Sequence, residues 1–411
     1  MQILMFTEAW PPLSGGVATS AHRVATSLAE LGGHEVTVFT FDSSEVVTSP
    51  PYVKEATVAV AGVKVLKFGP FFLKRPSDEI AGINEKHRAI LRRQVFDRMV
   101  EAVDAMPTRP ELVFSMYVVN AGWMATYLAN HMDVPHVLGV RGNDVGRNIF
   151  SVDRLYPVAL AVRNAAAVVC VNSHLRERLM LAFPEAGEKT RMIENSCRLP
   201  VLPVMDQAAA RSTLLGRAGW PDSSVVVSFI GAAREKKGIR ALLAALLEPG
   251  VSRDLRLALI GSRPTAADQR LFGDLWARLE DEGRLFCSGQ LDRAEALGLA
   301  LGSDIGTMPS IEDGLANGLL ESICLGLPVV VSDLFSEVVV EGVSGLVARR
   351  NDVAGLAAAL TQLARDAGLR AAMGRAALER ATERYSPQFE VTNYEEVFSC
   401  VLKRSLSSAP L

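Results

Sequence analysis

The chain has 411 residues, of which 49% are hydrophobic, and carries a formal net charge of -3 at pH 7. A chain of this length and composition predicts two domains of about 200 residues, each large enough for its own hydrophobic core. The nearly even charge argues against broad binding of nucleic acid, which requires a strongly basic surface.

Short β-branched runs alternate with helical patterns, which predicts an α/β fold with parallel sheets covered by helices on both faces. A first sheet is expected from residues 2–7, 35–41, 63–68, 111–115, 136–140, 167–171 and 191–194. A second sheet is expected from residues 225–230, 255–260, 284–287, 304–308 and 328–331. The segment 195–207, with Pro200 and Pro203, has the composition of a linker. We therefore expect domains at 1–200 and 205–385, and a terminal helix and tail at 386–411.

Two adjacent glycines, Gly15 and Gly16, follow the first expected strand and open a helix over residues 18–31. Their backbone N–H groups can approach an anion closely, because no Cβ atom stands in the way. A plain loop is the simpler explanation of such a pair taken alone. The sequence contains no G-x-G and no G-K pair, so the dinucleotide fingerprint and the P-loop are both missing. This counts against a dehydrogenase or a kinase.

The segment 66–75 mixes aromatic and basic residues, and four arginines follow it on an expected helix: Arg88, Arg92, Arg93 and Arg98. Such a patch can rest on an anionic bilayer or hold a charged acceptor. Aromatic residues in the core beside an exposed, charged helix face explain the same pattern. Both interpretations stay open.

Arg141, Gly142, Asn143 and Asp144 directly follow the expected strand 136–140. A guanidinium cannot act as a base near neutral pH, so Arg141 in a site must stabilise charge or bind an anionic group. Asp144 is an acid at the end of a strand. It fits a binding role and the capping of a following helix equally well.

A basic loop opens the second domain, where Arg234, Lys236 and Lys237 stand between an expected strand and a helix. Arginine offers a planar fork of donors and lysine a compact charge, and both oppose negative charge on a departing diphosphate. A solvated charged turn is the plainer explanation of these residues in isolation. We take Arg234 and Lys237 as candidate catalytic residues and expect Lys236 to face outward.

Two carboxylates, Asp313 and Glu321, flank a turn that opens a helix over residues 318–325. Asn317 is the expected N-cap of this helix, Gly326 its C′ residue and Pro328 its stop. The helix N-terminus attracts a diphosphate, so acids beside it suit sugar and ribose hydroxyls. Turn chemistry and the helix dipole each explain one acid alone. The remaining candidate donor-binding residues are those of the turn: Gly314, Leu315, Ala316, Asn317 and Gly318.

The combination of these segments resembles the retaining family-four glycosyltransferases. Residues 309–333 match the family's P-S-x-x-E-G-x-x-x-x-x-x-E-A followed by G-x-P-V-V-x-S-D, although Asp313 replaces the first Glu and Leu315 replaces an aromatic residue. Residues 11–16 match P-P-x-x-G-G, and residues 231–238 resemble G-x-x-R-x-K-K-G. Arg141 occupies the position of the histidine in the family's H-G-x-D, a histidine that approaches the donor sugar.

The resemblance implies the GT-B fold, in which two Rossmann-like domains face a central cleft and a C-terminal helix crosses back to the first domain. A nucleotide sugar, UDP- or GDP-linked, would place its ribose on Glu321. Its diphosphate would lie on Arg234, Lys237 and the Gly15 and Gly16 amides, with sugar hydroxyls near Asp313. Transfer to a hydroxyl on a small-molecule, glycan or lipid-linked acceptor would retain the anomeric configuration by a front-face mechanism. Arg141 would be catalytic and Asp144 would help to bind the donor.

We expect no cofactor and no metal, because the cationic clamp substitutes for one and the sequence lacks a convincing cluster of metal ligands. Two alternatives remain: an epimerase of the same fold and a non-catalytic nucleotide-sugar-binding protein. The five cysteines form no C-x-x-C pair, so we expect reduced, packed thiols. With no apolar stretch long enough to cross a bilayer, we expect a cytoplasmic protein, with peripheral contact at the inner membrane face left open.

Overall fold

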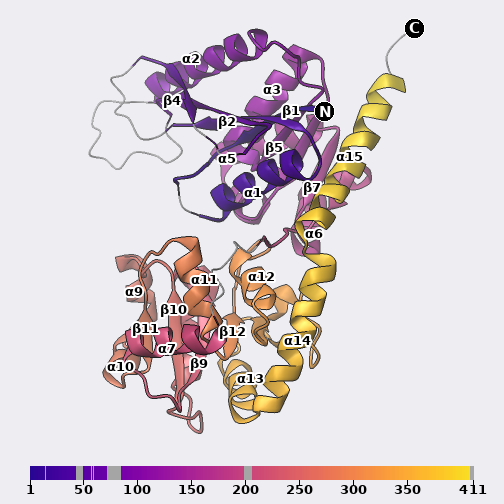
Figure 1. Cartoon of the computed structure of the whole chain (residues 1–411). Coiled ribbons are helices and arrows are strands. Elements are labelled where there is room, and N and C mark those ends of the chain that lie inside the picture. The colour runs from indigo at the N-terminus through magenta and orange to yellow at the C-terminus, as the bar shows by residue number, and fades with distance from the viewer. Residues whose placement is uncertain are drawn as a thin grey trace. The chain divides into compact units, whose positions relative to one another are not determined.

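The computed structural model describes residues 1–13, 15–42, 50–56, 58, 60–71, 85–198 and 206–407. The chain forms two compact units, which Figure 1 shows with their elements labelled. The first consists of Met1–Asn195 together with Pro387–Leu411, and the second of Ser196–Ser386. Each unit is built around one sheet with helices packed against it, which confirms the predicted α/β class.

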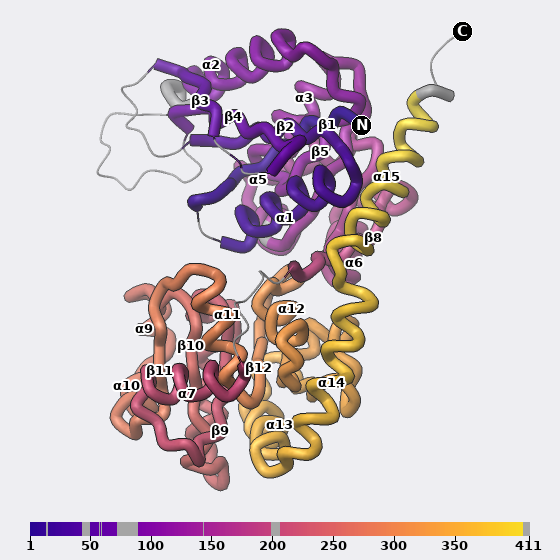
Figure 2. Tube along the Cα trace, viewed as in Figure 1, coloured from indigo at the N-terminus to yellow at the C-terminus, as the bar shows by residue number. Residues whose placement is uncertain are grey.

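The sheet of the first unit has the strand order β3-β4-β2-β1-β5-β6-β7-β8. These strands are β1 (Gln2–Thr7), β2 (Glu35–Phe41), β3 (Tyr52–Ala56), β4 (Val63–Gly69), β5 (Leu112–Met116), β6 (His136–Val140), β7 (Ala167–Cys170) and β8 (Thr190–Met192). They pair in parallel except for β3, an unpredicted strand that runs antiparallel to β4. Strand β3 lies beside β4 at the edge of the sheet (Figure 2). The strand order reverses between β1 and β5, and ligands bind at such a switch point in open α/β sheets.

Alternating residues of β1 explain how this sheet is buried on both faces. Ile3 and Met5 belong to one hydrophobic cluster, and Leu4 and Phe6 to another. Residues of α1 (Gly16–Glu30) and α15 (Pro387–Ser407) complete the first cluster, and residues of α2 (Glu85–Asp104) and α3 (Trp123–Met132) complete the second. The other helical segments of this unit are η1 (Val118–Gly122), α4 (Asn143–Gly146), η2 (Asn148–Phe150), α5 (Val152–Asn164), α6 (Ser173–Ala182) and η3 (Pro184–Lys189).

Helix α15 confirms the predicted terminal helix and contributes large side chains to the first unit. Its Tyr394 and Phe398 are fully buried, and their rings lie 5.1 and 5.6 Å from the ring of Phe114 on β5. Full burial of such a side chain contributes roughly 2 to 3 kcal/mol. The last segment of the chain is therefore part of the first core.

The sheet of the second unit is entirely parallel among the described strands, with the order β11-β10-β9-β12-β13-β14. The strands are β9 (Val225–Ile230), β10 (Leu255–Ile260), β11 (Leu285–Cys287), β12 (Ile305–Met308), β13 (Val329–Ser332) and β14 (Gly345–Ala348), the last of which was not predicted. The helical segments are α7 (Gln207–Ala218), η4 (Glu235–Lys237), α8 (Ile239–Leu246), α9 (Ala266–Phe272), α10 (Leu275–Asp281), α11 (Arg293–Leu301), α12 (Asn317–Cys324), η5 (Asp333–Phe335), α13 (Val353–Arg365) and α14 (Ala367–Arg384). The strand order reverses between β9 and β12.

The segment expected as a linker lies outside the described residues over 199–205, which includes Pro200 and Pro203. Asn195, Ser196 and Cys197 are buried, and the N–H of Cys197 donates to the carbonyl of Tyr385 at 2.8 Å. The start of this segment is thus packed rather than extended in solvent. All five cysteines are free, and the expectation of packed thiols is wrong for Cys400, which is exposed.

Candidate functional site

The two candidate segments of the second unit follow β9 and β12, the strands on either side of its switch point. Residues 231–238 follow β9, and residues 309–316 follow β12. The N–H groups of Ile311 and Glu312 donate to the carbonyl of Lys236, at 2.9 and 3.1 Å. A Cβ atom on Gly238, whose φ is +71°, would overlap the carbonyl oxygen of Pro309. Glycine and these backbone bonds hold the basic loop against the acidic loop.

Lys237 and Asp313 form an ion pair between these loops, from Nζ to Oδ2. Their side chains are 20% and 15% exposed, so the pair is largely shielded but reachable from solvent. The other carboxylate oxygen of Asp313 accepts the N–H of Gly314 at 3.0 Å. The predicted phosphate-binding cation and the predicted sugar-binding acid are therefore partners of each other.

The other two cations of the basic loop differ in their surroundings. Arg234 is exposed, and within the described part of the chain no hydrogen bond or ion pair is formed by its guanidinium. Lys236 is partly buried, so the expectation that it faces outward is wrong. Burial, together with the positive charge of Lys237, lowers the pKa of Lys236. The cation that is open to an incoming anion is Arg234.

Glu321, in the middle of α12, is paired with a residue that was not predicted. Its Oε1 accepts the Nε–H of Arg293, the first residue of α11, at 3.0 Å. The Glu321 side chain is 10% exposed and that of Arg293 is 40% exposed. Nothing in the spacing of the sequence singled out Arg293, because it stands 28 residues from its partner on another helix.

The N-cap of α12 is not the residue that the sequence predicted. Ala316 is the N-cap and Asn317 already the first helical residue, so the prediction that Asn317 caps this helix is wrong. The backbone of Ala316 is extended, at φ -68° and ψ 118°, and its side chain cannot accept the orphan N–H groups of the helix. Gly318 is required by packing, because a Cβ atom there would overlap the carbonyl of Ile230. Gly314, Leu315 and Ala316 are buried, which leaves backbone groups as their means of contacting a ligand.

At the switch point of the first unit, Glu8 follows β1 and Tyr117 follows β5. Oε1 of Glu8 accepts the N–H of Asn120 in η1 at 2.5 Å, and burial raises the pKa of Glu8 to about 7. Tyr117 has φ +83°, a region that is strained for a residue with a side chain. Burial and the negative charges of Asp144 and Glu8 raise the pKa of Tyr117. Sequence reasoning missed both residues, although each directly follows a strand end where ligands bind.

Asp144 is fully buried, and its oxygens accept backbone N–H groups. Oδ2 accepts from Arg141 at 2.7 Å, and Oδ1 accepts from Gly142 at 2.6 Å. Burial raises the pKa of this carboxyl, and these hydrogen bonds oppose the rise. Of the two interpretations of Asp144, this geometry favours the capping of the turn after β6.

The Arg141 side chain points to two neutral acceptors. One Nη atom donates to Oδ1 of Asn195 at 2.9 Å, and the other donates to the hydroxyl of Tyr394 on α15. Arg141 is partly exposed, whereas Asn195 and Tyr394 are buried. The structure thus brings Arg141 together with α15, a contact that the sequence did not predict.

The glycine pair at the start of α1 is exposed and unobstructed. Gly15 is the N-cap at φ +130°, and no atom lies within 4 Å of a Cβ placed on either glycine. Among the residues that the structure describes, no side chain caps this helix start. The space beside the two glycines is therefore open, which a ligand on the Gly15 and Gly16 amides would require. Ser14 lies outside the described residues.

The mixed aromatic and basic patch is described only in part. Phe68 and Phe71 are buried, and Phe71 stacks on Phe41 with ring centroids 3.9 Å apart. Arg93 and Arg98 lie on α2 and pair with Asp97 and Glu101. Residues 72–75 and the Arg88 side chain lie outside the described residues. Where it is described, the patch has core aromatics beside a charged helix face.

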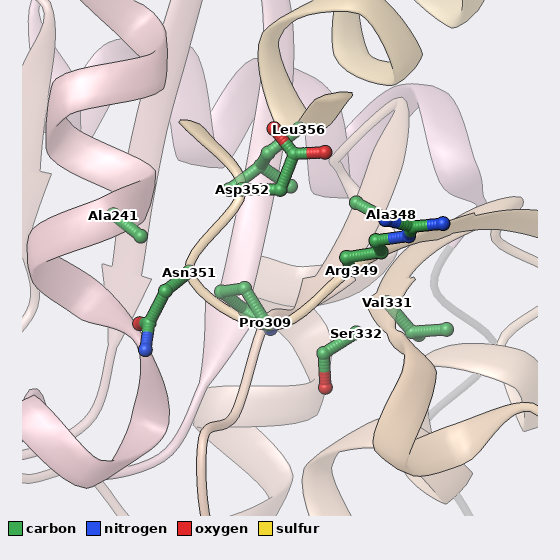
Figure 3. A pocket seen from close by; sticks show the side chains of 9 residues that line it. All are labelled: Ala241, Pro309, Val331, Ser332, Ala348, Arg349, Asn351, Asp352 and Leu356. Carbon is green, nitrogen blue, oxygen red and sulfur yellow. The ribbon is translucent and has the colours of Figure 1, made fainter. Parts of the chain in front are cut away.

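A small pocket lies at the carboxyl ends of β13 and β14 in the second unit (Figure 3). Its lining residues are Ala241, Pro309, Val331, Ser332, Ala348, Arg349, Asn351, Asp352 and Leu356. None of the candidate site residues is among them. Over the described ranges, no three His, Cys, Asp or Glu side chains are arranged to hold a metal ion. No helix in those ranges has the length and apolar character needed to span a membrane.

Comparisons with known proteins agree on one family. A model described as Glycosyltransferase Family 4 matches residues 14–198, and one described as Glycosyl transferases group 1 matches residues 224–366. Glycogen synthase of Mycobacterium tuberculosis is 24% identical over 97% of this chain and 94% of that protein. D-inositol 3-phosphate glycosyltransferase of Stackebrandtia nassauensis is 30% identical over 66% of this chain and 64% of its own.

The fold has counterparts among solved structures. Anabaena HepE in complex with UDP-glucose matches with a TM-score of 0.72 at 17% identity, over 97% of this chain and 100% of that one. This likeness shows the GT-B fold of glycosyltransferases. The two family matches, over residues 14–198 and 224–366, identify the chain as a member of the family-four, group 1 glycosyltransferases.

Proposed function

We propose that the protein is a retaining glycosyltransferase that takes its sugar from a UDP- or GDP-sugar and needs no metal. One observation carries this proposal. Arg234, Lys237, Asp313 and Glu321, chosen from the sequence as donor-binding groups, all lie on the elements that surround the switch point of the second unit. That position is where open α/β sheets bind nucleotides.

The ion pairs suggest how the donor is received. Glu321, held by Arg293, accepts hydrogen bonds from the ribose hydroxyls. The diphosphate binds the exposed Arg234 and draws Lys237 away from Asp313, because two phosphate groups offer a lysine more negative charge than one carboxylate. Asp313, once released, accepts hydrogen bonds from sugar hydroxyls. The same donor therefore exposes the acid that recognises its sugar.

The reaction follows from the charge that develops on the leaving group. As the glycosidic bond breaks, negative charge grows on the departing phosphate, and Arg234 and Lys237 stabilise it. This phosphate takes the proton of the acceptor hydroxyl on the same face of the sugar, so the anomeric configuration is retained. The acceptor is a hydroxyl on a small molecule, a glycan or a lipid-linked sugar. Other members of the family act on quite different acceptors, as the names of the two relatives above indicate.

Removal of one clamp cation tests the proposal. The first step identifies the nucleobase of the donor. The unfolding temperature is measured with UDP, GDP and ADP, and the preferred nucleotide raises it because a bound nucleotide stabilises the folded state. Release of that diphosphate from its sugar nucleotide is then measured for Arg234→Ala and Lys237→Ala. We expect a fall of more than about tenfold, or roughly 1.4 kcal/mol, in turnover.

Arg253→Ala is the matched control, because Arg253 is a cation of the same unit with a side chain that is 78% exposed. Its turnover should equal that of the unchanged protein. A loss of less than tenfold in both clamp variants contradicts the assignment. Magnetic resonance of the product tests retention separately, since an inverted anomer excludes the front-face mechanism.

A further inference from the structure

Arg141 is a cation at a strand end whose guanidinium is bound by neutral groups. Its two Nη atoms donate to the Asn195 side-chain oxygen at 2.9 Å and to the Tyr394 hydroxyl. Its Nε is buried without a hydrogen-bond partner. The nearby acid, Asp144, directs its oxygens to the backbone N–H groups of residues 141 and 142. Among the described residues, no carboxylate forms an ion pair with this guanidinium.

Arg23, which shares a hydrogen-bond acceptor with Arg141, does have a carboxylate partner. Nε and Nη2 of Arg23 donate to the two carboxylate oxygens of Glu390 at 3.1 and 3.0 Å. Nη2 of Arg23 also donates to Oδ1 of Asn195 at 3.2 Å, the atom that Arg141 shares. Two guanidiniums thus meet at one amide oxygen, and only Arg23 has a carboxylate partner. A charge that is partly withdrawn from water without a counter-charge loses hydration that no ion pair offsets, which favours a role in which a ligand supplies that counter-charge.

The frame around Arg141 is rigid. Tyr394 is fully buried, with its ring 5.1 Å from that of Phe114, and Asn195 is 5% exposed. Glu390 and Arg23 are 3% and 5% exposed, and their ion pair joins α15 to α1. A cation that is held in one place loses little freedom when it binds a ligand. Of the five N–H donors of an arginine, two are used here, and the partly exposed side chain leaves Nη donors for a planar anion.

We propose that Arg141 is a specificity-determining residue that binds an anionic group, a carboxylate or a phosphate, carried by one of the two sugar substrates. The inference rests on the proposed function, since it presumes a sugar donor and an acceptor. The anion belongs either to a uronic-acid donor or to a phosphorylated acceptor. In both cases the protein prefers the charged sugar to its neutral counterpart.

Calorimetry with matched neutral and charged probes tests this. The donor experiment uses the nucleobase that the protein prefers and compares the affinity for UDP-glucose with that for UDP-glucuronate, or for GDP-mannose with that for GDP-mannuronate. The acceptor experiment compares glucose with glucose 6-phosphate in the presence of saturating nucleoside diphosphate. We expect the charged probe to bind at least about tenfold more tightly in one experiment, the effect of one charge-assisted hydrogen bond.

Two variants separate the role of the charge from that of the fold. Arg141→Gln keeps donors toward Asn195 and Tyr394 but removes the charge, and we expect it to lose the preference while still binding the bare nucleoside diphosphate. Arg141→Lys keeps the charge and should keep part of the preference. Equal affinity for the neutral and charged probes in both experiments overturns the inference, even if neither variant folds. The inference is also overturned if Arg141→Gln still binds the charged probe more tightly than the neutral one. Absence of nucleotide binding in the unchanged protein instead contradicts the proposed function itself.

Discussion

Glu8 illustrates what the fold does to a single carboxyl group. It follows β1 at the switch point of the first unit, where burial raises its pKa from 4.5 to about 7. The N–H of Asn120 and neighbouring backbone groups oppose that rise but do not cancel it. The group therefore changes its charge near neutral pH, which is common for acids at functional sites.

The raised pKa makes stability depend on pH in a direction that can be predicted. A carboxyl with a raised folded-state pKa favours folding when protonated, so this contribution is complete below pH 4.5 and is lost as the pH rises past about 7. Glu8→Gln, neutral at every pH, should match the unchanged protein near pH 4.5. At pH 8 it should be more stable by up to about 3 kcal/mol, at 1.36 kcal/mol per pKa unit.

Urea unfolding at pH 4.5, 6 and 8 measures this difference. Glu55→Gln serves as the control, because the Glu55 side chain is 64% exposed and its substitution should change stability little at any of these pH values. A Glu8→Gln variant whose gain in stability is the same at all three pH values would show that Glu8 does not titrate as inferred.

At the level of one residue, the sequence suggested candidate site residues but not the side chains with which they form ion pairs. Lys237, Asp313 and Glu321 were chosen as candidates from motif and chemistry, yet their ion pairs could not be predicted. Each partner comes from a loop or helix far along the chain, as with Arg293 and Glu321. Lys236 was misjudged for the same reason, since its burial depends on the loop after β12.

Among the elements, α11 and α12 are joined at Glu321, the acid that we propose binds the donor. Arg293 is the first residue of α11 and holds the Glu321 carboxylate of α12 at 3.0 Å. The bond fixes where the acid points. We therefore expect Arg293 to act as a positioning residue for Glu321.

The expected result of Arg293→Gln is a loss of about tenfold in affinity for the nucleoside diphosphate, the cost of a disturbed charge-assisted hydrogen bond. The 2′,3′-dideoxy form of the nucleotide lacks the hydroxyls and should lose no affinity on the same substitution. Arg217→Gln is the control, since Arg217 on α7 pairs with Glu295 of α11 at 3.9 Å and both side chains are exposed. Calorimetry that shows equal losses for both nucleotides would rule out a positioning role.

The alternation of strands and helices in the sequence predicted most elements, and two strands escaped for local reasons. In β3, Val53, Lys54 and Glu55 are exposed, so the strand shows no alternation of apolar and polar residues. In β14, Gly345 weakens the β-pattern, but any Cβ there would overlap the carbonyl of Val329 on β13. The start of α12 was predicted one residue late, because Asn favours N-caps while this backbone turns helical at Asn317 itself.

At the scale of the whole molecule, α15 belongs to the first unit but follows the second unit in the sequence. It adds Tyr394 and Phe398 to the cluster that also contains Val24 of α1 and Phe114 of β5. The apolar pattern of residues 388–403 predicted a helix, but its packing partner came from family resemblance rather than from the pattern. The buried pair Arg23 and Glu390 spans 367 residues, a separation at which no local rule applies.

Phe398→Ala should lower the free energy of unfolding of the first unit by about 3 to 5 kcal/mol, because it leaves a cavity at a fully buried position. Denaturant unfolding followed by circular dichroism measures the change. Cys400→Ala, an exposed position on the same helix, controls for altered helix propensity and should stay within about 0.5 kcal/mol. A small loss for Phe398→Ala would mean that α15 is not part of the cooperative core.

The position of α15 after the second unit in the sequence has a consequence for biosynthesis. Domains generally fold as units while the ribosome is still translating, the N-terminal one first. Here that order cannot hold, because residues 1–195 lack Tyr394 and Phe398 until the whole of Ser196–Ser386 has been translated. While Ser196–Ser386 is translated and folds, the apolar surface of the first unit that α15 covers would stay exposed to solvent. Premature termination near Pro387 would consequently yield a polypeptide prone to aggregation and a substrate for chaperones and proteases.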